Sequence, residues 1–197
     1  LLYSSGTTGQ PKGIRITHGA LAANAVTLAD AWGFSAEDVL VHALPVFHVH
    51  GLFIVLGPAL MRGTRIRFLA SFDTKTVIEQ LKGATMMAGV PTYYGRLLNE
   101  ASFGAVDCAS VRVFISGSAP LSEAAFREFE ARTGHAILER YGMTETNMNT
   151  SNPYDGDRRA GTVGFPLPGV EVVVADPETG QELPDGEIGV LEIRGSN

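Results

Sequence analysis

Short apolar runs alternate with amphipathic stretches along most of this 197-residue chain, and this alternation is the strongest constraint on its fold. The apolar runs have the length of buried strands, and Thr17, Asp73 and Ser122 mark helix starts between them. Strands that alternate with helices form βαβ units. The sequence therefore predicts an α/β fold, with a mainly parallel sheet and helices on both faces. The expected helices cover residues 18–32, 51–62, 73–81, 91–99 and 122–133, and the expected strands cover 39–44, 64–69, 84–88, 111–115 and 136–138.

The pattern changes after about Pro166. Residues 170–175 and 187–194 are typical of strands, and turn-forming residues rather than a helix connect them. We therefore expect two parts. Residues 1–165 form an α/β unit, and residues 166–197 begin an antiparallel, β-rich subdomain that is incomplete.

Composition and charge narrow the possible functions. The formal net charge is −6 without a basic run, so nucleic-acid binding has no electrostatic support. No apolar stretch reaches the length of a transmembrane helix, so we expect no membrane insertion. A single cysteine, Cys108, rules out an internal disulfide and is compatible with a reducing compartment, which favours the cytoplasm. Because the chain opens on Leu1 and ends directly after an apolar strand, we expect a piece of a longer protein. Organellar targeting and oligomeric state stay open.

A glycine- and hydroxyl-rich run occupies residues 3–13, Tyr-Ser-Ser-Gly-Thr-Thr-Gly-Gln-Pro-Lys-Gly. Its glycines permit a tight turn that presents backbone N–H groups to an anion, its hydroxyls add donors, and Lys12 adds a positive charge. This predicts a phosphate-binding loop. It is not a Walker A loop, because Gly13 stands where that loop has Ser or Thr. The alternative is a flexible linker, which the apolar residues on both sides disfavour.

Further polar clusters follow other expected strands, and ligands of parallel sheets bind at the carboxyl ends of strands. Pro-Val-Phe-His-Val-His-Gly at 45–51 places His48 and His50 two residues apart, so an extended backbone would point both the same way. His48, beside an aromatic residue, is the better candidate for contacting substrate, whereas His50 is equally compatible with a core position. A His-x-His metal pair is the third alternative, but it lacks an evident third ligand.

Two more clusters lie further along the chain. Ser116–Pro120 is small and hydroxyl-rich, which also fits an ordinary turn before a helix. In the second cluster, Tyr141 offers a flat ring for a nucleotide base, Gly142 allows close approach and Thr144 offers a hydroxyl. Glu145 is a hard-oxygen ligand of the kind magnesium prefers. A polar surface junction is the alternative, and the phosphate loop makes a nucleotide site the favoured interpretation.

Four of these segments together resemble motifs of the adenylate-forming acyl-CoA synthetase superfamily. They are the loop at 3–13, Pro-Val-Phe-His at 45–48, Tyr-Gly-Met-Thr-Glu at 141–145 and Gly-Thr-Val-Gly-Phe-Pro-Leu-Pro-Gly at 161–169. The resemblance implies a two-step reaction in which a carboxylate attacks the α-phosphate of ATP, pyrophosphate leaves, and a thiol, usually CoA, takes the acyl group. It also implies that residues 1–165 belong to the large N-terminal domain of such an enzyme.

Within the superfamily, residues 115–121 and 139–157 resemble the malonyl-CoA synthetases. This implies a ligase of fatty acid metabolism that acts on malonate or a related short dicarboxylate, with ATP, Mg²⁺ and CoA. The resemblance implies catalytic roles for His48, Thr144 and Glu145, with Thr8 and Glu145 at the magnesium ion. The implied nucleotide-binding residues are Ser5, Gly6, Thr7, Thr8, Gly9, Lys12, Ser118, Ala119, Pro120, Tyr141, Gly142 and Thr144.

The chemistry of the residues gives a reason for a dicarboxylate. When one carboxylate approaches the α-phosphate, the distal carboxylate needs a partner, and Arg140 is a cation next to Tyr141. A charge-assisted contact of this kind contributes roughly 1.5–3 kcal/mol. Ser118, His48 and Gly142 complete the expected carboxylate site. The alternative for Arg140 is a solvent-facing residue or a partner of Glu139.

Two other functions stay open. One is an acyl-CoA synthetase or adenylation domain for another carboxylic acid, and the other is a non-catalytic nucleotide-binding module. The sequence does not separate malonate from methylmalonate, because one methyl group changes binding by only about 1 kcal/mol. The chain lacks the superfamily's ribose-binding aspartate, hinge and C-terminal lysine, so we expect residues 1–197 alone to be inactive.

Overall fold

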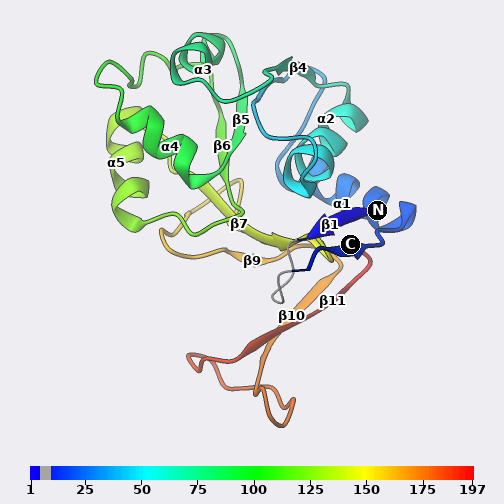
Figure 1. The fold of residues 1–197 in the computed structure, drawn as a ribbon. Helices are drawn as coiled ribbons and strands as arrows, with labels where there is room; N and C mark the ends of the chain where they lie inside the picture. The colour runs from blue at the N-terminus through cyan, green and yellow to red at the C-terminus, as the bar shows by residue number, and fades with distance from the viewer. Residues whose placement is uncertain (5–9) are drawn as a thin grey trace.

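The computed structural model describes residues 1–4 and 10–197, and within them seven strands form a central sheet in the order β4-β3-β5-β6-β7-β8-β9 (Figure 1). Strands β4, β3, β5, β6 and β7 are parallel, whereas β8 and β9 join at one edge in antiparallel pairing. The mainly parallel sheet predicted from the sequence is confirmed. The strands are β3 (Val39–His42), β4 (Arg65–Phe68), β5 (Met86–Gly89), β6 (Val113–Ser116), β7 (Leu138–Met143), β8 (Asn147–Ser151) and β9 (Phe165–Pro166).

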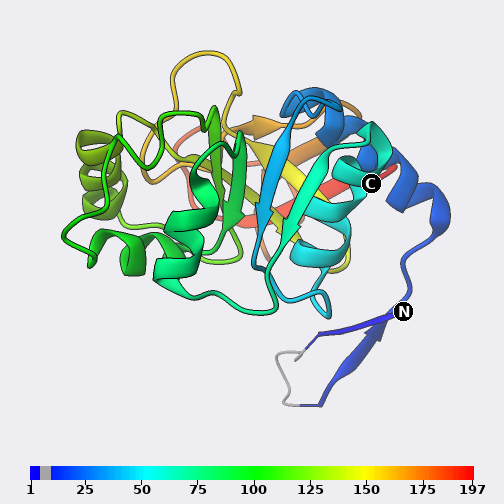
Figure 2. The same ribbon diagram turned by 90° about the horizontal axis from the view of Figure 1, so that it is seen from above.

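Helices cover both faces of this sheet, as Figures 1 and 2 show. Successive strand residues point to opposite faces, so each strand contributes to two cores. One face carries α3 (Thr74–Leu81), α4 (Pro91–Leu98) and α5 (Glu123–Thr133), and the other carries α1 (His18–Ala31), the π-helix η1 (His50–Val55) and α2 (Leu56–Arg62). In β3, Val39 and Val41 pack in the core beneath α3, α4 and α5, and Leu40 packs in the core beneath α1 and α2.

Three helices begin where the sequence predicts. The side chain of Thr17 accepts a hydrogen bond from the backbone N–H of Ala20 at 3.0 Å, which caps α1. Asp73 caps α3 and Ser122 caps α5 in the same way. Each cap satisfies an N–H group that has no partner within its own helix, and it therefore fixes the residue at which the helix starts.

Two elements differ from the sequence prediction. The strand expected at 136–138 instead begins at Leu138 as β7, runs to Met143 and folds back as β8, which was not predicted. This hairpin needs glycine at position 142, because a Cβ there would lie 2.0 Å from the backbone oxygen of Asn147. The helix expected at 51–62 divides into η1 and α2. Most residues of β8 are polar, so they lack the apolar alternation that identifies strands.

Two small sheets lie outside the central one. β1 (Leu2–Ser4) and β2 (Lys12–Ile14) pair antiparallel on either side of the predicted phosphate loop. β10 (Val170–Ala175) and β11 (Val190–Gly195) form the second pair, which confirms two antiparallel strands near the end of the chain. The domain division at residue 165 stays a prediction. No helix in the described part of the chain is long and apolar enough to cross a membrane.

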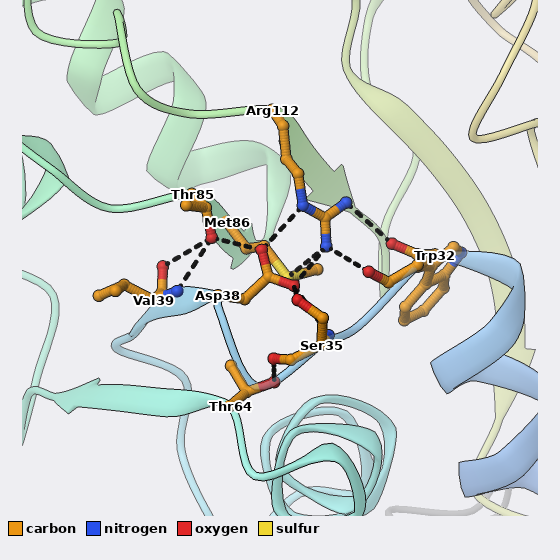
Figure 3. Close-up of polar contacts among 9 residues, drawn as sticks. Trp32, Ser35, Asp38, Val39, Thr64, Thr85, Met86 and Arg112 are labelled. Carbon is orange, nitrogen blue, oxygen red and sulfur yellow. Dashed lines mark hydrogen bonds and ion pairs between the residues drawn. The ribbon is translucent and has the colours of Figure 1, made fainter.

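An ion pair joins the amino ends of three parallel strands (Figure 3). Arg112, before β6, donates from Nε and Nη2 to the carboxylate of Asp38, before β3, and both distances are 2.9 Å. The hydroxyl of Thr85, before β5, donates to the same carboxylate at 2.7 Å. Arg112 also donates to the carbonyl oxygens of Trp32 and Gly33, at the end of α1. This cluster holds one helix and three strands together at the edge opposite their carboxyl ends.

The same cluster predicts acid sensitivity. Burial disfavours the charged form of Asp38, but hydrogen bonds from Arg112, Thr85 and Ser35 outweigh burial and lower its pKa from 3.8 to about 2. A carboxyl group with a lower pKa in the folded state stabilises the fold above its unfolded-state pKa, and this contribution is lost as the pH falls through its folded-state pKa. We expect the free energy of unfolding, measured with urea, to fall by about 2 kcal/mol between pH 4 and pH 2 because of this group. Asp38→Asn should remove that part of the pH dependence, and an unchanged dependence would contradict the assignment.

Candidate active site

Two adjacent cavities open at the carboxyl ends of the parallel strands, with volumes of about 500 and 430 Å³. Ser118, Arg140 and Gly142 line both cavities and so form the boundary between them. All four residues predicted to contact the substrate carboxylate line the first cavity: His48, Ser118, Arg140 and Gly142. Of the residues predicted to bind nucleotide, Ser118, Ala119, Pro120, Tyr141 and Gly142 line the second.

The other predicted residues are more scattered. Thr144 lies in the turn between β7 and β8 and lines the first cavity. Glu145, in the same turn, is exposed and lines neither cavity. Lys12 is an exposed residue of β2. The predictions for Ser5, Gly6, Thr7, Thr8 and Gly9 fall outside the described residues.

Arg140 is the most unusual side chain of the site. It is only 5% exposed, and its Nε and Nη2 atoms are buried without a hydrogen-bond partner in the described part of the chain. It therefore does not face solvent, and the neighbouring Glu139 instead accepts a hydrogen bond from the backbone N–H of Gly161. Burial lowers the pKa of Arg140 to about 10, which leaves it protonated at neutral pH. The cavity wall thus contains a buried positive charge.

His50 and Ser118 form a second polar contact in this wall. The Nδ1 atom of His50 lies 3.0 Å from Oγ of Ser118, and Ser118 has a left-handed backbone with φ of 69°. Burial, and next the charge of Arg140, hold the pKa of His50 well below 6.5, so its imidazole is neutral. A neutral ring can lie near the guanidinium without repelling it.

The sequence favours His48 over His50 as the histidine in contact with substrate. His48 is exposed at the edge of the first cavity, with its ring 4.6 Å from that of Phe47, whereas His50 is buried but lines the same cavity. The expectation that an extended backbone points both histidines the same way is wrong. Val49 already has helical angles, φ −50° and ψ −40°, because the chain turns into η1 there.

Two site residues were missed from the sequence. A Cβ at Gly117 would lie 2.4 Å from the guanidinium carbon of Arg140, so this position must be small. Asn147 lines the first cavity, is 1% exposed, and has no hydrogen-bond partner for either amide atom among the described residues. Its φ of 51° is one that asparagine tolerates better than most residues, which is the one local signal it carried.

A magnesium ion at this site would take most of its ligands from the nucleotide phosphates and water rather than from the protein. In the described residues, no group of three or more His, Cys, Asp or Glu side chains is placed to hold a metal ion. Mg²⁺ in nucleotide-dependent enzymes is usually held by one or two carboxylates together with phosphate oxygens and water. The exposed carboxylate of Glu145 fits such a site, because it supplies one hard-oxygen ligand and leaves room for the others.

Comparisons with known proteins agree with the fold. The family of AMP-binding enzymes matches residues 1–197. The malonate–CoA ligase of Arabidopsis thaliana is 37% identical over 200 residues, which cover 90% of this chain and 33% of the relative. The crystal structure of ATP-bound MatB from Rhodopseudomonas palustris superposes with a TM-score of 0.97 at 53% identity, over all of this chain and 39% of that one. A ternary product complex of malonyl-CoA ligase with methylmalonyl-CoA and AMP superposes with a TM-score of 0.89 at 48% identity. The match covers 100% of this chain and 43% of that one.

An α/β sheet with paired cavities at the carboxyl ends of its parallel strands is an architecture suited to nucleotides. The chain belongs to the AMP-binding enzyme family. The resemblance to adenylate-forming acyl-CoA synthetases is thereby confirmed. The chain spans about a third of the length of the curated relatives it matches.

Proposed function

We propose that the protein containing this chain activates malonate, or a related short dicarboxylate, as an acyl-adenylate and transfers the acyl group to CoA. The observation that carries the proposal is the buried guanidinium of Arg140 in the wall of the first cavity, without an ion-pair partner among the described residues. A buried charge is costly unless it is paired, so a substrate carboxylate is its natural partner. The malonate-related names of similar proteins support this substrate.

The two cavities divide the substrates between them. The acid occupies the first, with its distal carboxylate at Arg140 and Ser118, and His48 contacts it from the edge. The adenine occupies the second, where the half-buried ring of Tyr141 offers a stacking surface. Because Arg140 and Ser118 line both cavities, the acid and the nucleotide meet at this boundary. The reacting carboxylate is then held close to the α-phosphate, which removes much of the entropic cost of the reaction.

The remaining residues act on the phosphates. Thr144, in the first cavity, donates its hydroxyl hydrogen to the α-phosphate, and Lys12 with residues 5–9 binds the β- and γ-phosphates. Glu145, together with Thr8, would hold Mg²⁺, which when bound would neutralise charge on the phosphate oxygens. Neutral His50 fixes the Ser118 hydroxyl in the wall that Arg140 also lines. In this arrangement the chain mainly binds and orients the acid and the nucleotide. The negative charge that develops on the leaving group departs with pyrophosphate.

The domain arrangement is part of the same proposal. We propose that residues 1–165 belong to a large N-terminal domain and that residues 166–197 begin a β-rich subdomain in a cytoplasmic enzyme. The separate sheet formed by β10 and β11 supports this division. The pairing of β9 with β8 keeps the start of the second part attached to the central sheet.

The products of the reaction test the proposed chemistry. We expect the whole protein, given ATP, Mg²⁺, CoA and malonate, to release AMP and pyrophosphate in equal amounts with malonyl-CoA. Without CoA, hydroxylamine should trap an activated acyl group, because the adenylate forms before the thioester. Residues 1–197 alone should release no pyrophosphate. Formation of ADP and phosphate by the whole protein would contradict an acyl-adenylate intermediate.

A further inference from the structure

The guanidinium of Arg140 occupies the space that a side chain at position 117 would fill. Gly117 follows β6, and the neighbouring strand β7 carries Arg140. A Cβ at Gly117 would lie 2.4 Å from the guanidinium carbon and 2.5 Å from both Nε and Nη1. Real Cβ atoms essentially never come within 3.0 Å of another group, so any side chain here must displace the guanidinium.

The backbone does not explain the glycine. Gly117 does not have the positive φ that excludes other residues, whereas the next residue, Ser118, does, with φ of 69°. The φ angle at position 117 therefore does not require glycine, whereas the close approach of Arg140 does. The contact with Arg140 is the reason this position must be glycine.

Arg140 also has little freedom to move away without changing the cavity. It is 5% exposed, and the hydroxyl of Ser118, which lines the same cavity, lies 3.0 Å from Nδ1 of His50. Movement away from position 117 shifts the positive charge relative to this hydroxyl. Charge-assisted hydrogen bonds depend steeply on distance and angle, so even a small shift of the guanidinium weakens its interaction with a substrate carboxylate.

We propose that Gly117 is a positioning residue for dicarboxylate recognition, because the space left by its missing side chain sets where the Arg140 guanidinium lies. The proposal rests on the function proposed above and adds the residue that determines specificity at that site. Gly117 does not touch the reacting atoms, and it acts through Arg140. Its replacement is therefore expected to affect acids with a distal carboxylate and to spare acids without one.

Gly117→Ala in the whole protein tests this. We expect kcat/KM for malonate to fall at least about tenfold, mostly through KM, with KM for ATP and kcat/KM for butyrate within about twofold of wild type. Gly95→Ala is the matched control, because a Cβ at Gly95 in α4 meets no atom within 4 Å. Gly95→Ala should change kcat/KM for neither malonate nor butyrate.

A double-mutant cycle separates positioning from general damage. In an Arg140→Met background, Gly117→Ala should have no further effect on malonate, because the group it displaces is gone. Equal losses for malonate and butyrate, or the same loss in both backgrounds, would overturn the positioning role and leave a structural one.

Crystal structures of the wild type and Gly117→Ala separate failure of this inference from failure of the proposed function. We expect the guanidinium carbon to move about 1 Å, the difference between 2.4 Å and the 3.4 Å at which ordinary contact begins. An unmoved guanidinium, in an enzyme whose wild type prefers malonate, overturns the positioning role alone. A wild type without preference for malonate overturns the proposed substrate, and the recognition role of Gly117 with it.

Discussion

Arg140→Met is expected to lower kcat/KM for malonate about a thousandfold and to leave kcat/KM for butyrate unchanged or higher. The guanidinium of Arg140 is buried, protonated at neutral pH and without an ion-pair partner in the described residues. Methionine has a similar length but no charge, so a distal carboxylate in this cavity loses its partner and remains desolvated. The methyl end of butyrate has no such requirement and packs well against methionine.

Misfolding is not expected to obscure this result. The substitution removes a buried, unpaired charge, so the variant should be at least as stable as the wild type. Arg127→Met is the matched control, because Arg127 is an exposed residue of α5 whose ion pair, among the described residues, is with the exposed Glu123. Arg127→Met should leave kcat/KM for malonate and for butyrate unchanged. Equal losses of malonate and butyrate activity in Arg140→Met would show that Arg140 supports the fold or the nucleotide rather than the distal carboxylate.

Arg112→Met is expected to destabilise the fold by about 3–5 kcal/mol, the usual cost of breaking a buried ion pair by removing one partner. The Asp38 side chain is 5% exposed, so without Arg112 its charge stays buried with only the hydroxyls and N–H groups around it. The carbonyl oxygens of Trp32 and Gly33 lose a donor at the same time. The loss of stability should therefore affect β3, β6 and the end of α1.

Hydrogen exchange of the whole protein, followed by mass spectrometry, locates this effect. Amides of residues 28–40 and 111–116 should exchange about a hundredfold faster or more in Arg112→Met, because their opening free energy falls by several kcal/mol. Arg127→Met again serves as the control, since an exposed ion pair contributes at most about 1 kcal/mol. Exchange rates that match the wild type in both variants would show that the Asp38–Arg112 pair contributes little to stability.

Much of the fold follows from local signals in the sequence. The apolar strands β3, β5 and β6 are buried on both faces, so they read as continuous apolar runs, and the capping residues Thr17 and Ser122 set the helix starts. Because the carboxyl ends of parallel strands share one edge, the sequence also predicts that the polar clusters meet. This places His48, Ser118 and Arg140 at one cavity.

The features that the sequence did not reveal depend on contacts between distant segments. The hairpin of β7 and β8 lacks an apolar period, and the need for Gly142 appears only when Asn147 lies against it. His50 contacts Ser118 although 68 residues separate them, and Gly117, just after β6, faces Arg140 on the neighbouring strand β7. In the sequence, a glycine between two serines is typical of a turn. The need for glycine at position 117 becomes evident only from the position of the Arg140 guanidinium.

The ratio of kcat/KM for malonate to kcat/KM for butyrate, measured as ATP-dependent thioester formation by the whole wild-type protein, tests the central claim most directly. If the buried guanidinium of Arg140 receives a distal carboxylate, the ratio should be about a thousand or more, because butyrate leaves that charge unpaired. Methylmalonate should be used within about tenfold of malonate, since it keeps both carboxylates. A ratio near one would contradict the account, because the cavity would then accept acids without regard to the group that faces Arg140.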